Sequence, residues 1–551
     1  RSIGAVRWTP LALAVVTLGG LTAAGPAGAA GPGHPSRDLV LVLDRGVVHP
    51  RVEPADPALE LPRSVVHPRV EPADPALELP RSVAAGVGRR AAKAPLPGGH
   101  TPAGELDRLL AAGAIDRATH DRYAKTLVDA RRSLGRLSGT RRVELGAVLS
   151  NLDRIAAAGL LTPSRLPGLI LTLGRNRQWW TTGPLLGDGQ RVGFPGSQLV
   201  WEYYAGQGIE IQWLGTFGRA NGYFLGGRGH DAELTALLDE AVGLATQRAG
   251  GLAWEYDFRF DGGAPPWVSG LAQGTAIQAL SRAAVRFTRA DYFNAAHAGL
   301  GVFETPPPDG VRVATPAGAH YLIYSFAPGE RVLNAFIQAL VGLHDYAGLA
   351  NSDDGRALFS AGEAEARLEV PGYDTGAWSL YDQATESDLG YHTLLRDFLS
   401  HLCSRLEAAA TPAPPAGGPP PPGPTGGTPP TPPAPAPAPS PDVYCTAADH
   451  FTAYMHQPPG IAIAAVGRSR AGAPARLRIG LSKISEVTLT ASRGGRAVYR
   501  TTERLGHGTR TLTWRPAQPG RYRLTVAATD LAGNAAASAT VATVAPPVHR
   551  H

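Results

Sequence analysis

The hydrophobic periodicity of the chain changes near Gly460, and this change limits its possible folds more than any other feature. From residue 231 to residue 457, apart from a Pro-rich tract, apolar residues recur at helical spacing in segments separated by aromatic loops. From Gly460 onward, apolar and polar residues alternate as they do in half-buried strands. We therefore expect a mainly helical domain followed by a β-sandwich at residues 459–547.

The helical part contains six segments with this spacing and no predicted strand between them. They span residues 231–249, 268–287, 289–302, 331–349, 355–368 and 391–406. Repeated helical pairs of this kind favour an α/α-toroid, a fold in which aromatic loops line a sugar groove at one end. A β-hairpin is expected before them, around Gly206 and Gly208, because β-branched and aromatic residues flank both glycines.

The N-terminal segment, residues 1–30, has the pattern of a signal peptide. Arg1 and Arg7 accompany an apolar run at 11–21, and small residues follow this run. The run is shorter than the roughly 20 residues that cross a bilayer. We therefore expect a protein that is secreted or associated with the cell envelope, without stable membrane insertion after signal removal. A retained membrane anchor is the alternative.

Residues 31–98 are expected to be disordered. The sequence VVHPRVEPADPALELP occurs at 47–62 and again, unchanged, at 65–80, and its dense prolines indicate a recent tandem duplication and not a folded repeat. From residue 99 to residue 166 the periodicity becomes helical, with Thr101 as the expected cap of the first helix.

A Pro-, Gly- and Ala-rich tract occupies residues 411–441. The segment after it has apolar residues near helical spacing and is expected to be the last helix of the helical domain, so the tract is an insert within that domain. Cys403 and Cys445 flank the tract. Two cysteines in an exported protein predict one disulfide, with two buried free thiols as the alternative. Two cysteines cannot supply a four-ligand zinc site, and no metal site is expected.

The sandwich segment is strongly basic. Residues 460–551 hold 14 Arg and Lys against Glu486, Glu503 and Asp530, which is a formal charge of about +11, whereas the whole chain carries +6. The sequence DLAGN at 530–534 resembles the final-strand motif of bacterial Ig-like modules. We therefore expect an Ig-like sandwich that attracts an anionic polymer, with an inert basic stalk as the alternative. Nucleic acid is not an expected partner.

Three stretches of the helical part resemble a known family. They are PPWVSGLAQGTAIQALSRA at 265–283, YLIYSFAPGERVLNAFIQALVGL at 321–343, and PGYDTGAWSLYDQ at 371–383 with LGYHTLLRDFL at 389–399. In order and spacing they are similar to the sugar-site helix, the Tyr-rich loop and the paired-tyrosine segment of D-glucuronyl C5-epimerases. Over residues 167–457 the chain resembles the catalytic domain of this family, as a divergent secreted bacterial member.

The resemblance implies an isomerase that inverts C5 of hexuronate residues in an anionic polysaccharide, without a cofactor. Inversion removes a proton α to a carboxylate and returns one on the opposite face, which requires two acid/base groups beside one sugar ring. By position, Tyr324, Tyr381 and Tyr391 match the catalytic tyrosines of the family. The expected substrate-binding residues are Tyr256, Trp267, Gln273, Tyr321, Arg331 and Asn334.

Several of these residues also have a structural interpretation. Tyr381 is compatible with a buried aromatic side chain whose hydroxyl is satisfied, and Gln273 with a packing amide. Asn334 lies near a predicted helix start and is compatible with a cap. Trp254, Tyr256 and Trp267 form either a sugar-stacking platform or part of the core.

The sequence departs from the family pattern at two positions. Ile323 replaces the glutamate that precedes the first catalytic tyrosine, and Ala384 replaces an arginine that follows the second. Arg331 or Arg282 could supply a compensating cation. Without the glutamate, we expect a tyrosine pair to carry both proton transfers, or activity to be absent.

Two other functions remain open. The first is a toroid polysaccharide lyase or glycosidase that uses Glu255, Asp257, Asp374 or Asp382 as acid and base, and paired carboxylates beside one groove would favour it. The second is a non-catalytic polysaccharide-binding protein on the same scaffold, which the residues Ile323 and Ala384 favour.

Overall fold

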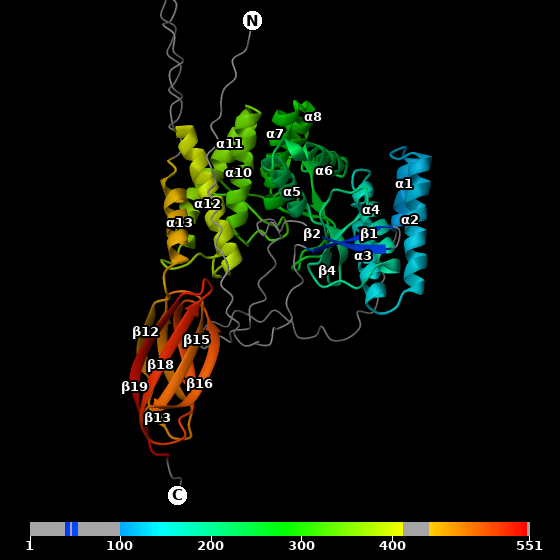
Figure 1. Cartoon of the computed structure of the whole chain (residues 1–551). Coiled ribbons are helices and arrows are strands. Elements are labelled where there is room, and N and C mark those ends of the chain that lie inside the picture. Colours follow the sequence, from blue (N-terminus) through cyan, green and yellow to red (C-terminus); the bar gives the residue numbers. More distant parts are fainter. Residues whose placement is uncertain (1–38, 45–46, 53–99, 411–439, 548–551) are drawn as a thin grey trace, which may run out of the picture.

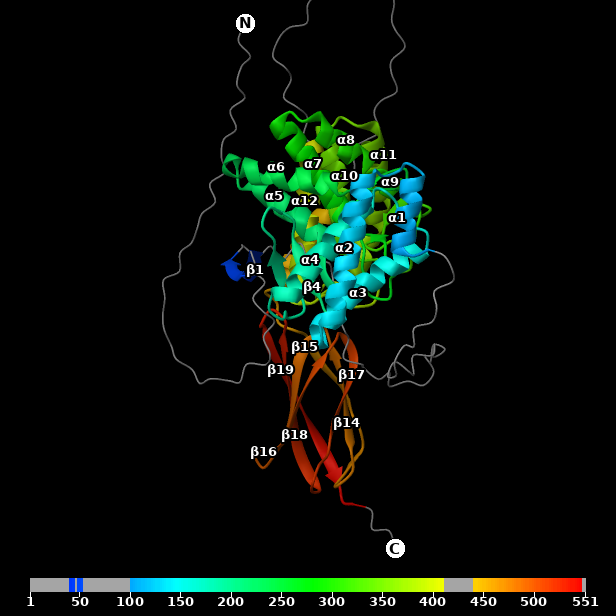
Figure 2. The same cartoon turned by 90° about the vertical axis from the view of Figure 1, so that its right-hand side faces the viewer.

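The computed structural model describes residues 39–44, 47–52, 100–410 and 440–547. The expected signal peptide, the second copy of the duplicated sequence and nearly all of the Pro-rich tract lie outside these residues. Helices and small sheets make up the described chain as far as Tyr454, and strands make up the rest (Figure 1). In both views the strand-rich part projects from one end of the helical part (Figure 2). None of the helices in the described ranges combines the length and apolarity that a membrane span requires.

The first four helices pack together beside a mixed sheet (Figure 2). They are α1 (Pro102–Ala111), α2 (Arg117–Arg136), α3 (Gly139–Ala157) and α4 (Leu166–Thr182). The hydroxyl of Thr101 accepts a hydrogen bond from the backbone N–H of Gly104, so the expected N-cap is confirmed. Leu145 and Leu173 are fully buried among these helices and the sheet.

The mixed sheet has the strand order β2-β1-β3-β4-β5. Its strands are β1 (Leu39–Asp44), β2 (Val47–Val52), β3 (Arg191–Gly193), β4 (Trp201–Tyr204) and β5 (Gly208–Ile211). The expectation of disorder throughout residues 31–98 is therefore wrong for β1 and β2. Val40 and Leu43 on β1 bury their side chains. Pro50 lies in β2, which is an edge strand, the position in a sheet where proline is tolerated.

The main helical body confirms the mainly helical character that the periodicity predicted. It contains α5 (Trp213–Leu225), α6 (Asp231–Gly243), α7 (Gly270–Phe287), α8 (Ala290–Ala298), α9 (Gly301–Glu304), α10 (Leu333–Leu349), α11 (Asp353–Glu369), α12 (Leu389–Ala410) and α13 (Asp442–Tyr454). The helices α5, α7, α10 and α12 pack in that order, and each is backed by α6, α8, α11 or α13 (Figure 1). The helix expected over 231–249 ends at Gly243, because a hairpin of β6 (Thr246–Arg248) and β7 (Gly251–Ala253) follows it.

The central helices α7 and α10 approach each other closely at two glycines. A Cβ atom on Gly342 would lie 2.1 Å from the carbonyl oxygen of Gly274, and one on Gly274 would lie 2.7 Å from the Cα of Ala339. Neither glycine can be replaced without moving a helix backbone. This contact fixes the relative position of the two helices whose N-terminal ends adjoin the candidate site.

Two facing sheets form the C-terminal part. One contains β12 (Ile461–Val466), β14 (Ala475–Leu481) and β17 (Gly508–Trp514); the other contains β13 (Ser469–Arg470), β19 (Ala535–Ala545), β18 (Gly520–Asp530), β15 (Ser485–Arg493) and β16 (Arg496–Leu505). Leu477 and Leu512 from the first sheet meet Leu489 and Val526 from the second, and all four are fully buried. The alternating pattern thus forms a sandwich with its own core.

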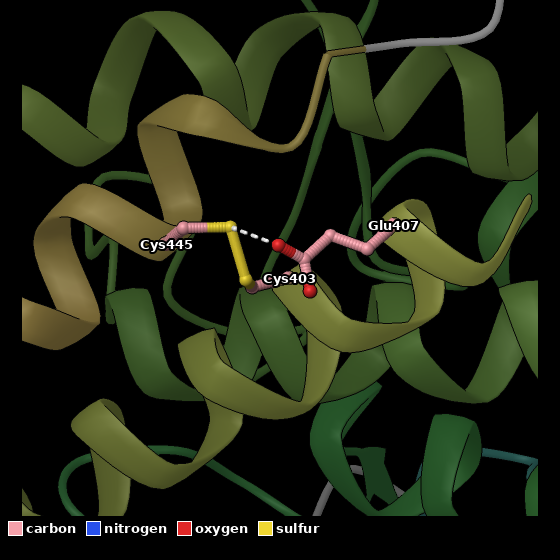
Figure 3. A group of neighbouring side chains, drawn as sticks. All are labelled: Cys403, Glu407 and Cys445. Carbon is pink, nitrogen blue, oxygen red and sulfur yellow. Dashed lines mark hydrogen bonds between the residues drawn. A yellow bond between two sulfur atoms is a disulfide. The ribbon is translucent and has the colours of Figure 1, made fainter. Parts of the chain in front are cut away.

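A disulfide joins Cys403 on α12 to Cys445 on α13, and this is the expected pair (Figure 3). The two Cα atoms lie 5.1 Å apart, and the bridge closes a sequence separation of 42 residues. The helices on either side of the Pro-rich tract are therefore covalently connected.

Candidate active site

Three tyrosines from separate segments of the chain form one group. Tyr324 follows strand β11 (Ala319–Tyr321), Tyr381 lies in a short hairpin made by residues 379–387, and Tyr391 lies in the first turn of α12. The ring centroids of Tyr381 and Tyr391 are 4.9 Å apart. Both residues act electrostatically on the hydroxyl of Tyr324. The fold therefore brings the three expected catalytic residues together.

Tyr324 is held in a wall of aromatic rings. Its ring lies 5.1 Å from that of Phe326, nearly parallel to it, and 5.5 Å from that of Trp267 in an edge-to-face contact. The indole N–H of Trp267 donates to the carbonyl of Phe258 at 2.8 Å, which fixes this ring. Burial raises the pKa of the Tyr324 hydroxyl well above its usual value, so at neutral pH the hydroxyl keeps its proton.

Backbone hydrogen bonds close the hairpin that carries Tyr381. The N–H of Tyr381 donates to the carbonyl of Thr385 at 2.7 Å, and Oδ1 of Asp382 accepts from the N–H groups of Ala384 and Thr385. The first residue of α10, Leu333, donates its N–H to the carbonyl of Tyr381 at 3.3 Å. Tyr381 itself is buried, and this burial, together with Tyr391, raises its pKa.

The sequence analysis does not identify Glu330, which brings a carboxylate to this group. Glu330 acts electrostatically on both Tyr324 and Tyr381. Partial burial, reinforced by Asp261 and Asp382, raises the pKa of Glu330. A carboxyl group whose pKa is raised in this way is suited to exchange protons near neutral pH. The feature of the sequence that could have identified Glu330 is its position in the same loop as Tyr324.

Gln383 connects the loop of Glu330 to the hairpin of Tyr381. Its Nε2 donates to the carbonyl of Gly329 at 2.8 Å, and its Oε1 accepts from the N–H of Arg331 at 3.1 Å. These two hydrogen bonds bracket Glu330. The side chain of Gln383, the neighbour of Ala384, thus fixes the loop that carries Glu330.

The two arginines considered as compensating cations are engaged by carboxylates elsewhere. The guanidinium of Arg331 pairs with Glu365 and Glu369 on α11. That of Arg282 pairs with Asp345 at 2.9 Å and donates to the side chain of Asn221 at 2.8 Å. The structure therefore does not direct either guanidinium to the tyrosines, because each already has buried or half-buried acceptors.

Four of the expected substrate-binding residues are almost completely buried, and their polar atoms meet backbone groups. Tyr256 accepts from the N–H of Leu214, Trp267 donates to Phe258, Gln273 donates to Leu252 and Gly299, and Tyr321 donates to Leu358. The rings of Tyr256 and Trp267 stack at 4.3 Å. In this structure these four side chains therefore connect neighbouring loops and helices through their polar atoms.

Asn334, on the first turn of α10, behaves differently. It is 2% exposed, and within the described part of the chain neither atom of its side-chain amide has a hydrogen-bond partner. It does not cap the helix, because the N-cap position is Val332 and no side-chain cap is formed there. A buried amide without a partner carries a desolvation cost that a polar ligand group would relieve.

Two of the four carboxylates that would support a glycosidase, Glu255 and Asp257, lie together and line the same small pocket. Glu255 is fully buried between Arg165 and Arg248, each at 2.6 Å. Burial and the neighbouring Glu255 raise the pKa of Asp257 to about 8. Asp374 instead contacts α13 and accepts from His450 at 2.8 Å and Tyr454 at 3.3 Å.

The fourth carboxylate that the sequence analysis proposed as an acid or base is Asp382. It acts electrostatically on Tyr381 and therefore belongs to the tyrosine group.

Within the described ranges, one group of His, Cys, Asp and Glu side chains is close enough to be considered as a metal site. It consists of Cys403, Glu407 and Cys445, and Glu407 lies 3.9 Å from the sulfur of Cys445 (Figure 3). Both sulfurs belong to the disulfide, so neither can serve as a thiolate ligand. This group is a structural crosslink beside a surface carboxylate.

Comparison with known proteins places the tyrosine group within a family domain. Residues 249–409 match the family model described as the D-glucuronyl C5-epimerase C-terminus. A D-glucuronyl C5-epimerase of Caenorhabditis elegans is 34% identical over 131 residues, which cover 21% of this chain and 21% of the relative. The chain thus spans about a fifth of the length of that curated relative.

The similarity to solved structures is weaker. An endo-beta-1,4-glucanase, CMCax from Acetobacter xylinum, is matched with a TM-score of 0.26 and 14% identity over 35% of this chain and 65% of that one. An engineered protein is matched with a TM-score of 0.14 and 14% identity over 73% of this chain and 85% of that one. Scores this low carry no argument about fold or function. The family model, in contrast, covers Tyr324, Tyr381 and Tyr391, so the tyrosine group lies in the segment that matches the D-glucuronyl C5-epimerase C-terminus.

Proposed function

We propose that this protein inverts C5 of hexuronate residues in an anionic polysaccharide. The observation that carries the proposal is the convergence of Tyr324, Tyr381, Tyr391 and Glu330 within the segment that matches the epimerase family. These groups come from two loops and one helix start, and we propose that they flank one sugar ring. That arrangement meets the requirement for two proton-transfer groups at one carbon.

Because the pKa values of Tyr324 and Tyr381 are raised, both hydroxyls stay protonated at neutral pH. A neutral tyrosine hydroxyl is a weak base by itself. A tyrosine becomes an effective base if it gives its own proton to a carboxylate as it takes the proton from C5. We propose that Glu330, whose charge acts on both tyrosines, receives that proton. The C5–H electron pair moves toward the uronate carboxylate to give an enolate-like species, and a second tyrosine then donates a proton to the opposite face of C5. The tyrosinate that remains is reprotonated through solvent as Glu330 releases the proton it received, which restores both groups.

Tyr391 is suited to exchange this proton with water. It is half-buried, whereas Tyr324 and Tyr381 are nearly inaccessible. Its ring contacts that of Tyr381, so its hydroxyl is the one of the three that combines access to solvent with a place in the group. Repeated turnover in deuterated water would then place solvent deuterium at C5.

A polysaccharide lyase is the second candidate, because β-elimination begins with the same removal of the C5 proton. The gathering of Asp261, Glu330 and Asp382 around the tyrosines favours it, since a lyase also needs a proton donor for the leaving oxygen at C4. Product analysis separates the two functions. Epimerisation changes the ratio of C5 epimers in the NMR spectrum of an intact polymer, whereas elimination shortens the chain and leaves an unsaturated uronate that absorbs ultraviolet light. An intact, unchanged polymer that still binds would support the non-catalytic alternative.

The wider organisation belongs to the same proposal. We propose that the helical body is an α/α-toroid, that the sandwich is Ig-like, and that the protein is exported and acts at the cell surface or outside the cell. The paired packing of α5 to α13 and the two facing sheets support the first two points. The signal-like segment at residues 1–30 supports the third.

The basic sandwich is proposed to attract the polymer. Arg476 and Arg478 on β14 and Arg500 and Arg504 on β16 are exposed to solvent. Attraction by exposed charge weakens as salt screens it. Full-length protein should therefore bind a uronate polymer more tightly than a neutral glycan at low salt, and the difference should shrink at high salt. Equal binding of both polymers at low salt would show that the sandwich has no such role.

A further inference from the structure

The sandwich contacts the helical domain at two neighbouring places. At the first, Lys483 donates to the carbonyl of Tyr454 at 2.7 Å, and Asn534 donates to the carbonyl of Met455 at 2.9 Å. Lys483 and Asp530 form an ion pair at 2.6 Å, in which each side chain is 1% exposed. The first and last residues of the DLAGN sequence thus help to fix the sandwich at the end of α13.

The second contact is made through one carboxylate of the helical domain, Glu386. Its Oε1 accepts from the N–H of Ile484 at 2.7 Å, and its Oε2 accepts from the N–H of His507 at 2.7 Å. Nδ1 of His507 lies 3.1 Å from the same Oε2. The Glu386 side chain is 5% exposed. Hydrogen bonds to a charged, desolvated carboxylate are among the stronger ones in proteins.

Glu386 belongs to the hairpin that carries Tyr381. It pairs with Leu380 across the hairpin, and the next hydrogen bond joins the N–H of Tyr381 to the carbonyl of Thr385. At the hairpin base, Trp378 donates its indole N–H to the carbonyl of Ser387 at 2.8 Å. The sandwich therefore holds the strand of the hairpin that lies opposite the tyrosine.

We propose that the β-sandwich positions Tyr381 through Glu386, so that the reaction rate depends on a domain that does not contact the reacting sugar. Glu386 is a positioning residue in this scheme. Without its donors from the sandwich, the hairpin keeps only its short internal ladder and its contacts with the helical domain. The effect on rate rests on the proposed epimerase function, whereas the effect on hairpin order does not.

The test compares full-length variants in two measurements. Glu386→Ala removes the acceptor, and Glu386→Gln keeps one carbonyl oxygen. Gly506→Ala acts from the sandwich side, because a Cβ there would lie 3.0 Å from Oε2 of Glu386. Glu503→Gln is the matched control, since Glu503 is exposed on β16. Hydrogen exchange of residues 379–387 reports hairpin order, and steady-state kinetics with a uronate polymer report kcat and KM.

Glu386→Ala should increase hydrogen exchange in the hairpin about tenfold and reduce kcat about tenfold, with KM changed less than twofold. Glu386→Gln and Gly506→Ala should show smaller changes in the same direction, and the control should show none. Unchanged hairpin exchange in both Glu386 variants would overturn the proposal, as would a rise in KM with constant kcat. If Glu386→Ala does not fold, Gly506→Ala decides by the same criteria. If the wild-type chain shows no C5 exchange, the proposed function fails and hairpin exchange alone decides.

Discussion

The ring of Tyr381 lies 4.9 Å from the ring of Tyr391, although one belongs to a loop hairpin and the other to helix α12. The contact depends on how the hairpin is attached. Its base is bound to α12 through His392, whose Nδ1 lies 2.8 Å from Oγ of Ser379, and its other strand is bound to the sandwich through Glu386. The geometry of the tyrosine pair is therefore set by three parts of the molecule that are distant in sequence.

Replacing Glu330 should identify the carboxylate that receives the proton. Glu330→Gln removes the acceptor and should lower kcat/KM by about 10²-fold, within the usual range for loss of an acid/base group. Because the deprotonated form accepts the proton and its pKa is raised, the wild-type activity should increase with pH through a midpoint above 4.5. The pH profile of kcat/KM measures this limb.

The same profile offers a matched pair of variants. Asp261→Asn removes a like charge that helps to raise the pKa of Glu330, so the midpoint should move to lower pH. Glu304→Gln, at an exposed position on α9, should leave the profile unchanged. A midpoint that stays in place in Asp261→Asn, or a Glu330→Gln variant with full activity, would contradict the role given to Glu330.

His392 should make the stability of the helical domain sensitive to acid. Burial lowers its pKa to about 4, whereas an unfolded histidine titrates near pH 6.5. The folded state therefore binds fewer protons between these values, so this contribution to stability is complete above about pH 6.5 and decreases as pH falls through about 4. Its size is at most about 3 kcal/mol.

Chemical unfolding at a series of pH values measures the effect. In His392→Phe, which retains a ring against Trp378, the free energy of unfolding should depend less on pH between 4 and 6.5, although the loss of two hydrogen-bonding nitrogens lowers stability at all pH values. The exposed His456→Phe serves as control. Identical pH dependence in wild type and His392→Phe would show that another group is responsible.

The disulfide should stabilise the α12–α13 pair. Loop-closure entropy for a separation of 42 residues corresponds to about 4 kcal/mol in the chain-entropy model. Reducing the wild-type protein should lower the denaturant midpoint of the helical domain, and the variant with both Cys403→Ala and Cys445→Ala should be insensitive to the reductant. If reduction leaves the wild-type midpoint unchanged, the crosslink does not contribute to folding stability.

Long periodic segments of the fold could be predicted because their pattern is local. The helix expected over 331–349 is observed as α10 at Leu333–Leu349, and that expected over 355–368 is observed as α11 at Asp353–Glu369. Three-residue strands such as β6 are too short to show a period of two. Strand β1 pairs with β3, which follows it by about 150 residues, and no local pattern records such a pairing.

The candidate site was predictable to the extent that its residues resemble a family motif. The resemblance suggested Tyr324, Tyr381 and Tyr391, and the structure places them together. It did not suggest Glu330, whose proximity to the tyrosines depends on the hydrogen bonds of Gln383 and on partial burial. It also could not show that Gln273 is satisfied by backbone carbonyls, because burial is a property of the tertiary structure.

Deuterium incorporation at C5 tests the central claim most directly. A uronate polymer is incubated in deuterated water with the wild-type chain, with Tyr381→Phe, or with Tyr499→Phe, a control in the sandwich whose hydroxyl donates to the carbonyl of Thr513. NMR then measures the C5 proton. We predict progressive loss of the C5 proton signal with the wild type and the control, and at least about 10²-fold slower loss with Tyr381→Phe at unchanged folding. Full exchange by a folded Tyr381→Phe variant, or none by the wild type, would contradict the proposed epimerase mechanism.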